Sequence, residues 1–368
     1  MRVLIVGGGI AGLATARALR LRGLEAEVVE RDPEPRTAGA GVYLPGNGIV
    51  ALRHLGMADE VIAHGAVVER RRLLDEHGRS LIDFDEAGLW HDVAPPIALH
   101  RRVLHEILLR GAEGTPIRFG VTVTSLEARA DAVDATFSDG TTRAFDLVVG
   151  ADGVHSWVRQ AVVGGPPARP AGQVGWRWVV EGHPEIDGWN GWLGPDRAFL
   201  ALAIGGGRVY GYADIRTTDP SDPTGGDPSR LAAMFDGFAE PVGAFLAAIP
   251  PADVWFAPIE EVTPTWGSGR IVLVGDAAHA SSPNMAEGAS LAIEDAWLLA
   301  EALADRPVVG EAIDAFIARR SPRIRHVQAT THRRDRLRYA PPWIRRLTMA
   351  VAGRRIFHAH YRPLLDPP

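Results

Sequence analysis

The feature that most constrains this chain is a glycine-rich turn directly behind its first apolar segment. Residues 2–6 are mostly apolar and β-branched, which predicts a buried strand. Residues 7–12 have the spacing G-x-G-x-x-G, and a helical pattern continues from Ala11 to Arg22. Residues 26–30 predict a second short strand. Strand, tight turn, helix and strand in this order indicate the opening βαβ unit of a doubly wound sheet.

Three glycines and one acidic residue of this unit suit dinucleotide binding. Gly7 allows the tight turn, Gly9 lets a diphosphate approach the backbone, and Gly12 permits close packing of the helix on the sheet. The N-terminus of the helix then faces the anionic diphosphate. Glu30, at the end of the second strand, suits a ribose hydroxyl and would repel the 2′-phosphate of NADP. We expect a bound dinucleotide; the alternative is a glycine-rich turn with only a structural role.

Two later segments each end an apolar strand in Gly and Asp. The first leads to Asp152, and the second leads to Gly275 and Asp276. In an open parallel sheet, ligands bind beyond the carboxyl ends of the strands, so Asp276 is placed to accept a ribose or ribityl hydroxyl. A helix that begins near Gly288 would direct its amides at the pyrimidine oxygens of a flavin. One such segment alone can be a capped turn, but three nucleotide-compatible motifs in order favour a cofactor site.

The composition excludes several classes of protein and site. The 368-residue chain has a net charge of −6, without the basic surplus of a nucleic-acid-binding protein. The absence of cysteine excludes disulfides, thiolate metal sites and a catalytic cysteine. All 39 basic residues are arginine, which excludes a Schiff-base lysine. No apolar run reaches the roughly 18–20 residues of a membrane span. We expect a cytoplasmic protein with no metal site.

The order of the motifs predicts the organisation of the chain. Residues 174–215 alternate in the β manner and carry many aromatic side chains, and an Asp-Gly pair at 139–140 predicts a hairpin. Because cofactor motifs lie on both sides of this region, we expect an α/β fold: a doubly wound, Rossmann-like cofactor-binding domain with an inserted antiparallel β-sheet substrate domain and C-terminal helices. The expected cofactor-binding domain comprises residues 1–70, 98–170 and 265–330, the substrate domain residues 71–97 and 171–264, and the helical tail residues 331–368.

These motifs together resemble one known family. The three glycine and aspartate motifs, in this order, are similar to those of class A flavoprotein monooxygenases, the para-hydroxybenzoate hydroxylase-like and salicylate hydroxylase-like group. Residues 100–104 (His-Arg-Arg-Val-Leu) are similar to the family's R-x-x-L helix start, and residues 176–180 to the segment that opens its substrate sheet. The resemblance covers nearly the whole chain and is specific for the superfamily, but it does not identify a substrate.

The resemblance implies FAD as the cofactor and assigns residues to it. The residues implied to hold the ADP moiety are Gly7, Gly9, Ala11, Gly12, Glu30 and Arg31, with Val123 at the adenine. Those implied near the flavin, its ribityl chain or its diphosphate are Val42, Arg101, Gly275, Asp276, Pro283, Ala286, Gly288 and Ala289. Asp152 and Arg159 are implied to support the cofactor and the nicotinamide. One departure is Glu287, where the family often has Gln; a buried carboxylate there would take up a proton or face away from the ring.

The same resemblance implies the reaction. NADH or NADPH would reduce FAD, O₂ would add to form a flavin C4a-hydroperoxide, and one oxygen atom would pass to a small aromatic or polycyclic substrate. Candidate catalytic residues are Tyr210 and Tyr212, which share one face of a strand with Asp214, and Asn284, which lies near the expected flavin ring. The alternative for the tyrosines is core packing. The aromatic insert predicts a flat, apolar substrate with few charges. We expect a monomer or homodimer.

Three other functions stay open at this point. The first is a flavin-dependent halogenase, but residues 176–180 lack its proline and the chain has no lysine to carry hypohalous acid. The second is an FAD-dependent reductase or dehydrogenase without oxygen insertion. The third is a flavin-binding regulatory protein without catalysis. The basic, amphipathic segment 341–357 can pack on its own domain, contact a partner subunit or contact a membrane surface.

Overall fold

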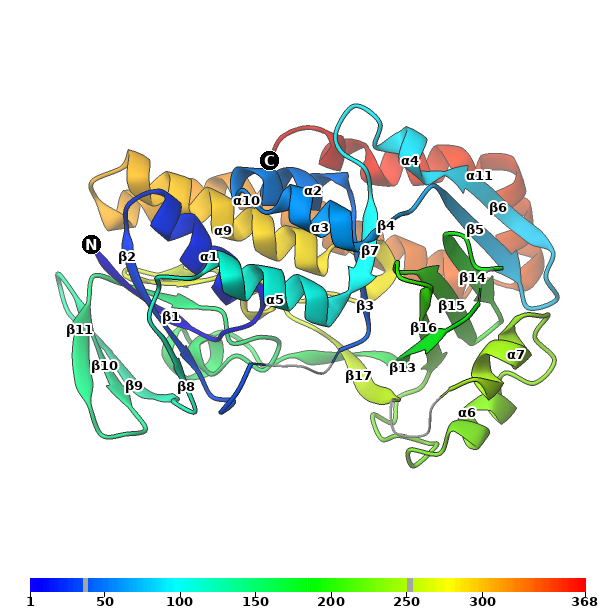
Figure 1. The fold of residues 1–368 in the computed structure, drawn as a ribbon, viewed down its shortest axis with the longest axis horizontal. Helices are drawn as coiled ribbons and strands as arrows, with labels where there is room; N and C mark the ends of the chain where they lie inside the picture. Colours follow the sequence, from blue (N-terminus) through cyan, green and yellow to red (C-terminus); the bar gives the residue numbers. More distant parts are fainter. Residues whose placement is uncertain (36–38, 184, 250–253) are drawn as a thin grey trace.

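The structure is a computed structural model that describes residues 1–35, 39–183, 185–249 and 254–368. Two sheets lie at opposite ends of the molecule, and long helices run along both (Figure 1). None of the helices within the described ranges is long and apolar enough to cross a membrane.

The first sheet is the predicted doubly wound sheet. Its strand order is β18 (Gly267–Ser268), β19 (Ile271–Leu273), β12 (Leu147–Gly150), β1 (Arg2–Val6), β2 (Glu25–Glu30) and β8 (Ile117–Phe119). Every neighbouring pair except β18–β19 is parallel. The α/β fold class expected from the sequence is confirmed.

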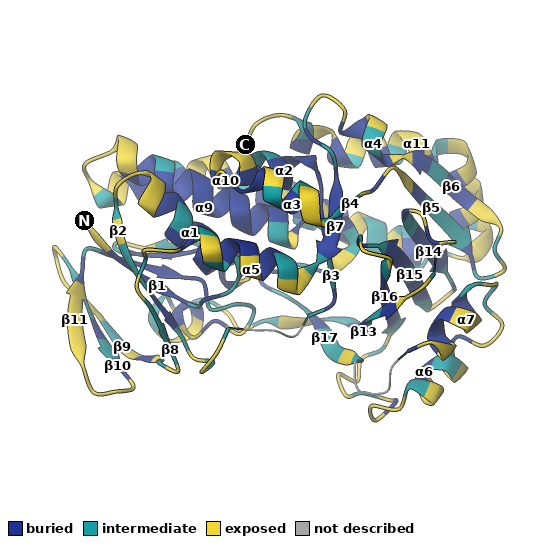
Figure 2. Cartoon of the chain, in the orientation of Figure 1, coloured by how far each residue is buried: buried dark blue, intermediate teal, exposed yellow. Residues whose placement is uncertain are grey.

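Strand β1 is buried on both faces because different layers cover them. Val3 and Ile5 pack with the helices α1 (Ile10–Leu21) and α9 (Gly288–Asp305), whereas Leu4 and Val6 face a three-stranded sheet. That small sheet comprises β9 (Val123–Ala128), β10 (Val133–Phe137) and β11 (Thr142–Phe145). The predicted hairpin at residues 139–140 joins β10 to β11 and is confirmed. Figure 2 shows that α9 is buried along most of its length.

The second sheet has seven strands and includes the predicted aromatic region. Its order is β17 (Trp255–Glu261), β13 (Arg169–Glu181), β16 (Arg208–Arg216), β15 (Arg197–Ala203), β14 (Trp189–Leu193), β5 (Arg70–Asp75) and β6 (Ser80–Asp85). All neighbours are antiparallel except β14 and β5. Residues 70–85 thus join a sheet whose other strands come about a hundred residues later.

The two faces of this sheet divide its aromatic residues. Four of them, Trp176, Trp178, Trp192 and Phe199, belong to the core that packs on α6 (Pro228–Met234) and α7 (Val242–Ala247). Tyr210 and Tyr212 share one face of β16, as their spacing predicts, and this face is opposite to the one that carries the tryptophans. Most of the aromatic insert is therefore core, and only part of it is available to a substrate.

The remaining elements connect the two sheets and cover them. A small sheet is formed by β3 (Gly41–Leu44), β7 (Ile97–His100) and β4 (Ala66–Val67). The other helices and helical turns are α2 (Gly46–His54), α3 (Ala58–His64), α4 (Glu86–Leu89), α5 (Arg101–Gly111), η1 (Val158–Val162), α8 (Asp276–His279), η2 (Pro283–Met285), α10 (Val309–Arg338) and α11 (Pro342–Leu365). The expected domain boundary at residue 331 falls inside α10, and the division into domains stays a prediction.

Candidate functional site

One cavity of about 1010 Å³ brings most of the predicted site residues together. It extends from the carboxyl ends of β1, β2 and β12 to the inner face of the seven-stranded sheet. Seventeen of the twenty predicted residues line it: Gly7, Gly9, Ala11, Glu30, Arg31, Val42, Arg101, Val123, Asp152, Asp276, Pro283, Ala286, Gly288, Ala289, Tyr210, Tyr212 and Asn284. Gly12, Gly275 and Arg159 are not among the lining residues.

The glycine turn leaves room for a ligand at one position only. A Cβ atom on Gly7, whose φ is +110°, would lie 2.4 Å from the carbonyl oxygen of Ala151. A Cβ atom on Gly12 would lie 1.9 Å from the carbonyl oxygen of Gly7. In contrast, a Cβ atom on Gly9, the residue just before α1, would meet no protein atom within 4 Å. The packing of the protein itself therefore requires glycine at positions 7 and 12. The space beside Gly9 is free for a bound group.

Glu30 is held at the edge of this space by the backbone. Its carboxylate accepts hydrogen bonds from the amide of Gly8 at 2.7 Å and from the amide of Asp32 at 3.0 Å. Each oxygen keeps a further lone pair that can accept a hydroxyl hydrogen bond. The position fits the ribose role that the sequence predicts for Glu30.

Two helix N-termini open onto the cavity without a side-chain cap. Neither α1 nor α9 has a capping side chain or an acidic residue in its first turn. Gly9 and Gly288 at these two ends both line the cavity. Ala286, just before α9, has a φ of +55° and is the one non-glycine residue of the described chain with positive φ. Glycine adopts this conformation without strain, whereas the Cβ atom of alanine disfavours it.

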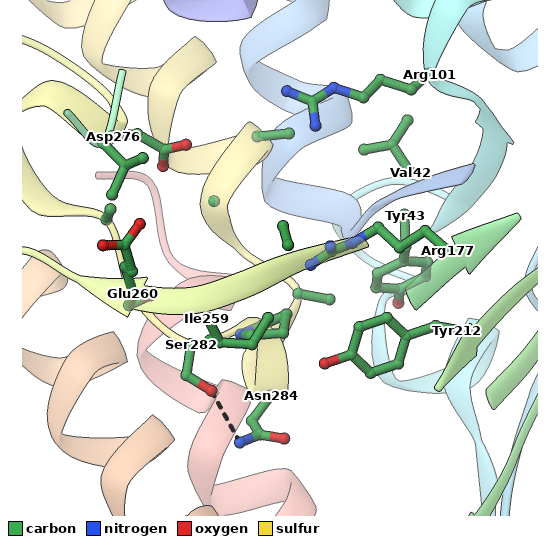
Figure 3. A pocket seen from close by; sticks show the side chains of 18 of the residues that line it. Val42, Tyr43, Arg101, Arg177, Tyr212, Ile259, Glu260, Asp276, Ser282 and Asn284 are labelled. Carbon is green, nitrogen blue, oxygen red and sulfur yellow. Dashed lines mark hydrogen bonds between the residues drawn. The ribbon is translucent and has the colours of Figure 1, made fainter. Parts of the chain in front are cut away.

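These features fit FAD. An uncapped helix N-terminus with free space beside Gly9 suits the diphosphate, and the amides at Gly288 suit the electron-rich oxygens of the flavin pyrimidine. Figure 3 shows Val42 and Arg101 on one side of the cavity and Asp276 on the other. Asp276 is exposed to the cavity at the start of α8 and can accept ribityl or ribose hydroxyl hydrogen bonds.

A buried charge cluster behind the cavity fixes the loops that carry these residues. Asp295 accepts hydrogen bonds from the amide of Gly275 at 2.9 Å, from His279 at 2.7 Å and from Arg320 at 2.7 Å. Burial alone would raise the pKa of Asp295, but His279 and Arg320 outweigh it and hold the pKa below its ordinary value. The carboxylate thus anchors α8, and with it Asp276, from within the protein.

Glu287 faces away from the cavity into the same cluster. It is 2% exposed, and its Oε2 atom accepts a 3.1 Å hydrogen bond from Asn47. The same Asn47 amide donates to Glu294 at 3.0 Å, and Glu287 Oε1 has no hydrogen-bond partner among the described residues. Burial, together with Glu294, raises the pKa of Glu287 to about 8. Glu287 is not among the residues that line the cavity, and its raised pKa favours the protonated carboxyl group.

The other end of the cavity lies against the seven-stranded sheet. Arg177 on β13 is directly opposite Tyr212 on β16, and its guanidinium carbon lies 5.3 Å from the centre of the Tyr212 ring. Figure 3 shows both side chains reaching into the cavity, with the Tyr212 hydroxyl directed toward Asn284. This hydroxyl is buried without a hydrogen-bond partner among the described residues. Burial, reinforced by Asp214, raises the pKa of Tyr212 well above its ordinary value, so its hydroxyl keeps its proton.

Asn284 and Arg334 form the floor of this end. The Asn284 amide donates to Ser282 Oγ at 3.1 Å and to Asp335. Arg334 donates to the Asn284 carbonyl oxygen at 2.8 Å and to Nδ1 of His360 at 3.1 Å, and its Nη2 atom has no hydrogen-bond partner within the described part of the chain. Burial and Arg334 lower the pKa of His360 to about 4, so the imidazole is neutral.

Two other arginines at this end are neutralised by carboxylates. Arg71 pairs with Glu86 through two 2.9 Å hydrogen bonds, and Arg338 pairs with Asp214. Among the described residues, Arg177 and Arg334 have no ion-pair partner. The centre of the Trp189 ring lies 3.9 Å from the Arg71 guanidinium carbon, and the Tyr43 hydroxyl donates a hydrogen bond to Glu86. These contacts hold Arg71 and Glu86 in place in the cavity wall. This end therefore combines aromatic surface with two uncompensated positive charges.

The comparisons with known proteins decide the family. A family model described as an FAD binding domain matches residues 1–179 and 255–333. The chain belongs to this family. It is 34% identical over 348 residues to 3-amino-4-hydroxybenzoate 2-monooxygenase of Streptomyces cremeus, covering 91% of this chain and 86% of that protein. It is 34% identical over 353 residues to 2-heptyl-3-hydroxy-4(1H)-quinolone synthase of Pseudomonas aeruginosa, covering 93% and 91%.

A solved structure that contains FAD is similar over the whole chain. Klebsiella pneumoniae HpxO, complexed with FAD and uric acid, aligns with a TM-score of 0.90 at 27% identity, covering 100% of this chain and 97% of that one. The predicted FAD cofactor and the predicted class, a flavin-dependent monooxygenase of the aromatic hydroxylase type, are confirmed at the level of the family. The relatives differ in their substrates, so the family does not specify the substrate of this member.

Arg159 and Gly275, which the family motifs assigned to the cofactor, do not line the cavity and have structural roles. The guanidinium of Arg159 is fully buried and donates to the carbonyl oxygens of Val154, Pro166 and Ala277. Gly275, with a φ of +59°, packs against Ala11 and Ala292. Asp152 does line the cavity, but its carboxylate is occupied by Ser156 and the amide of Val158 at the start of η1.

The site residues that sequence reasoning missed are the arginines. Arg71, Arg177 and Arg334 come from two strands and a helix that are far apart in the chain. Arg177 lies in segment 176–180, which resembles the start of the family's substrate sheet, but that resemblance assigned no role to its side chain. For Arg177 the available signal was its place in an alternating strand, on the face opposite to Trp176 and Trp178.

Proposed function

We propose that this protein hydroxylates an aromatic small molecule that carries an anionic group, with NADH or NADPH as the electron donor and O₂ as the oxygen source. When bound, FAD takes up electrons from the nicotinamide and activates O₂ for insertion. The observation that carries the proposal is a pair of guanidinium groups in one cavity, Arg177 and Arg334, that have no ion-pair partner among the described residues. Arg177 lies 5.3 Å from the centre of the Tyr212 ring. A cytoplasmic location, where NAD(P)H is supplied, belongs to the same proposal.

The charge at this end of the cavity favours an anionic aromatic substrate over a neutral one. Four arginines line this end: Arg71 and Arg338, which are paired with Glu86 and Asp214, and Arg177 and Arg334. A carboxylate or ring oxyanion placed near Arg177 and Arg334 would form charge-assisted hydrogen bonds in a partly dry site. Two names among the relatives, aminohydroxybenzoate monooxygenase and urate hydroxylase, also denote acids. The expectation of an apolar substrate with few charges therefore gives way to an aromatic acid.

Tyr212 would orient this substrate as a hydrogen-bond donor. Its raised pKa excludes the phenolate form at neutral pH, so it is not a general base. Its unpartnered hydroxyl lies between Arg177 and Asn284, where a substrate hydroxyl or oxyanion would satisfy it (Figure 3). Tyr210, whose pKa is also raised by burial, would complete the aromatic wall.

An anaerobic titration tests the proposal. We expect NADH or NADPH to bleach the visible band of the FAD-loaded protein, and hydroxylated benzoates to accelerate bleaching more than the matching benzamides. The variant Arg177→Gln should weaken benzoate binding roughly 10–100-fold, because it removes a charge-assisted hydrogen bond. Arg169→Gln, an exposed arginine of the same strand, is the matched control and should bind benzoate normally.

The two parts of the proposal fail differently. If neither nicotinamide bleaches the flavin with any aromatic compound present, the electron donor is wrong. If bleaching occurs but benzoates and benzamides act equally, or if the Arg177 variant keeps its benzoate affinity, the anionic substrate is wrong.

A further inference from the structure

The exposed face of the last helix, α11, carries an apolar stripe that no described residue covers. Trp343 is 68% exposed, Leu347 60% and Val351 75%. They are spaced four residues apart and so lie on one face of the helix. These are the three most exposed large apolar side chains of the described residues. Single exposed apolar residues are common, but an aligned set of three is typical of an interaction surface.

The same face is strongly basic. Arg346, Arg354, Arg355 and Arg362 are all exposed, and none forms an ion pair with a described residue. Arg354 donates only to the carbonyl oxygen of Asp83. The helix contains no Asp or Glu between Pro342 and Leu365, although the whole chain has a net charge of −6. This helix is therefore basic throughout, although the chain as a whole is acidic.

The inner face of α11 explains why the stripe is not a packing defect. Met349, Phe357 and Tyr361 are buried against β6 and the rest of the core, so the helix already has a complete buried side. Met349 and Phe357 also line the cavity, together with Ile356 and His360. Helix α11 therefore lies between the cavity and the exposed apolar stripe formed by Trp343, Leu347 and Val351.

We propose that this outer face of α11 docks on an anionic membrane surface. A tryptophan and two aliphatic side chains, flanked by arginines, have the composition of an interfacial helix, whose apolar side chains enter the headgroup region while its cations contact acidic lipids. A second copy of the chain is the less favoured partner, because a two-fold interface would place the same arginines opposite one another. The inference is independent of the proposed function and needs only the exposed helix.

The consequence for the enzyme is a location at the membrane surface. A docked α11 would hold the cavity wall formed by Met349, Ile356 and Phe357 one helix away from the lipid headgroups. This arrangement suits substrates that partition between membrane and water.

Vesicle sedimentation with the full-length, FAD-loaded protein tests the proposal. Two vesicle types are compared: phosphatidylcholine alone, and phosphatidylcholine in which about a third is replaced by phosphatidylglycerol. We expect binding to the anionic vesicles that weakens at about 0.5 M salt, and little binding to the neutral ones. Leu347→Glu should reduce binding at least about tenfold, because it removes an inserted side chain and adds a repelled charge.

A second pair of variants separates charge from fold. Arg346→Gln combined with Arg355→Gln keeps the apolar stripe and should lower binding to the anionic vesicles by about tenfold. Val308→Glu, which changes a 52% exposed residue at the far end of α10, adds the same charge elsewhere and should leave binding unchanged. Unchanged FAD content in all variants shows that each is folded.

Three results would overturn the proposal. One is the absence of wild-type binding to both vesicle types. Another is equal loss of binding in the Val308 and Leu347 variants. The third is a wild-type dimer in solution that dissociates in the Leu347 variant, since this would assign the stripe to a second copy of the chain.

Discussion

The Gly9→Ala variant is expected to fold like the wild-type protein and to bind FAD roughly 10–100-fold more weakly. Gly9 has an ordinary φ of −80°, and a Cβ atom there meets no protein atom within 4 Å. The new methyl group would instead occupy space beside the N-terminus of α1, where the diphosphate is expected. An overpacked contact of this kind costs about 1–3 kcal/mol. Thermal unfolding of the apoprotein and FAD titration by fluorescence quenching measure the two effects separately.

Gly12→Ala provides the contrast within the same turn. Its Cβ atom would lie 1.9 Å from the carbonyl oxygen of Gly7, so α1 must move away from β1. We expect this variant to lower the unfolding temperature of the apoprotein, which Gly9→Ala leaves unchanged. If Gly9→Ala binds FAD as tightly as the wild type, the diphosphate does not lie beside Gly9 and the placement of the cofactor is wrong.

Glu287→Gln is expected to stabilise the protein by about 3 kcal/mol at pH 7. In the folded protein the pKa of Glu287 is raised from 4.5 to about 8 by burial, so folding at neutral pH requires this group to take up a proton. Each pKa unit between these values corresponds to about 1.4 kcal/mol, and pH 7 lies between them. Glutamine avoids the proton uptake and keeps an oxygen that can accept the hydrogen bond from Asn47.

The sign of this effect gives it a characteristic pH dependence. The folded state holds a proton that the unfolded chain releases near pH 4.5, so the wild type loses stability as the pH rises from about 4.5 to about 8. The advantage of the variant should therefore vanish near pH 4.5 and grow toward pH 8 in denaturant unfolding curves. An advantage that is the same at both pH values would contradict the buried, protonated Glu287.

Glu294→Gln is the matched control one layer deeper in the same cluster. Glu294 accepts hydrogen bonds from Arg320 at 2.5 Å and from Arg323 at 2.9 Å, so its charge is compensated. Its replacement leaves two buried guanidinium groups short of a carboxylate and should destabilise the protein by about 3–5 kcal/mol. Two glutamates that share Asn47 are thus expected to respond with opposite signs.

The cofactor end of the site was predictable from sequence because its residues are consecutive. The turn from Gly7 to Gly12 has constraints that only glycine meets, and its spacing survives as a motif. The same reasoning placed Asp276 and Gly288 at strand and helix ends, where an open sheet binds ligands. It did not distinguish residues that line the cavity from residues that support it, and Arg159 is of the second kind.

The substrate end was not predictable because it depends on register and rotation. Arg177 lies beside Tyr212 only because β13 and β16 pair with these two residues opposite one another. Arg334 is one of many arginines of α10, and the rotation of that helix decides which of them faces the cavity. The alternation of β13 separated Arg177 from its tryptophan neighbours, but no local pattern shows which face of a sheet will meet a cofactor.

The most direct test of the central claim follows the oxygen atom. The FAD-loaded protein is supplied with NADH or NADPH, with ¹⁸O₂ and with the aromatic acid that most accelerates flavin reduction, and the product is analysed by mass spectrometry. We predict a product that contains one ¹⁸O atom from O₂, with the second oxygen atom released as water. Consumption of the nicotinamide with only hydrogen peroxide formed, and no labelled product from any acid that binds, would contradict monooxygenation and indicate a flavin reductase.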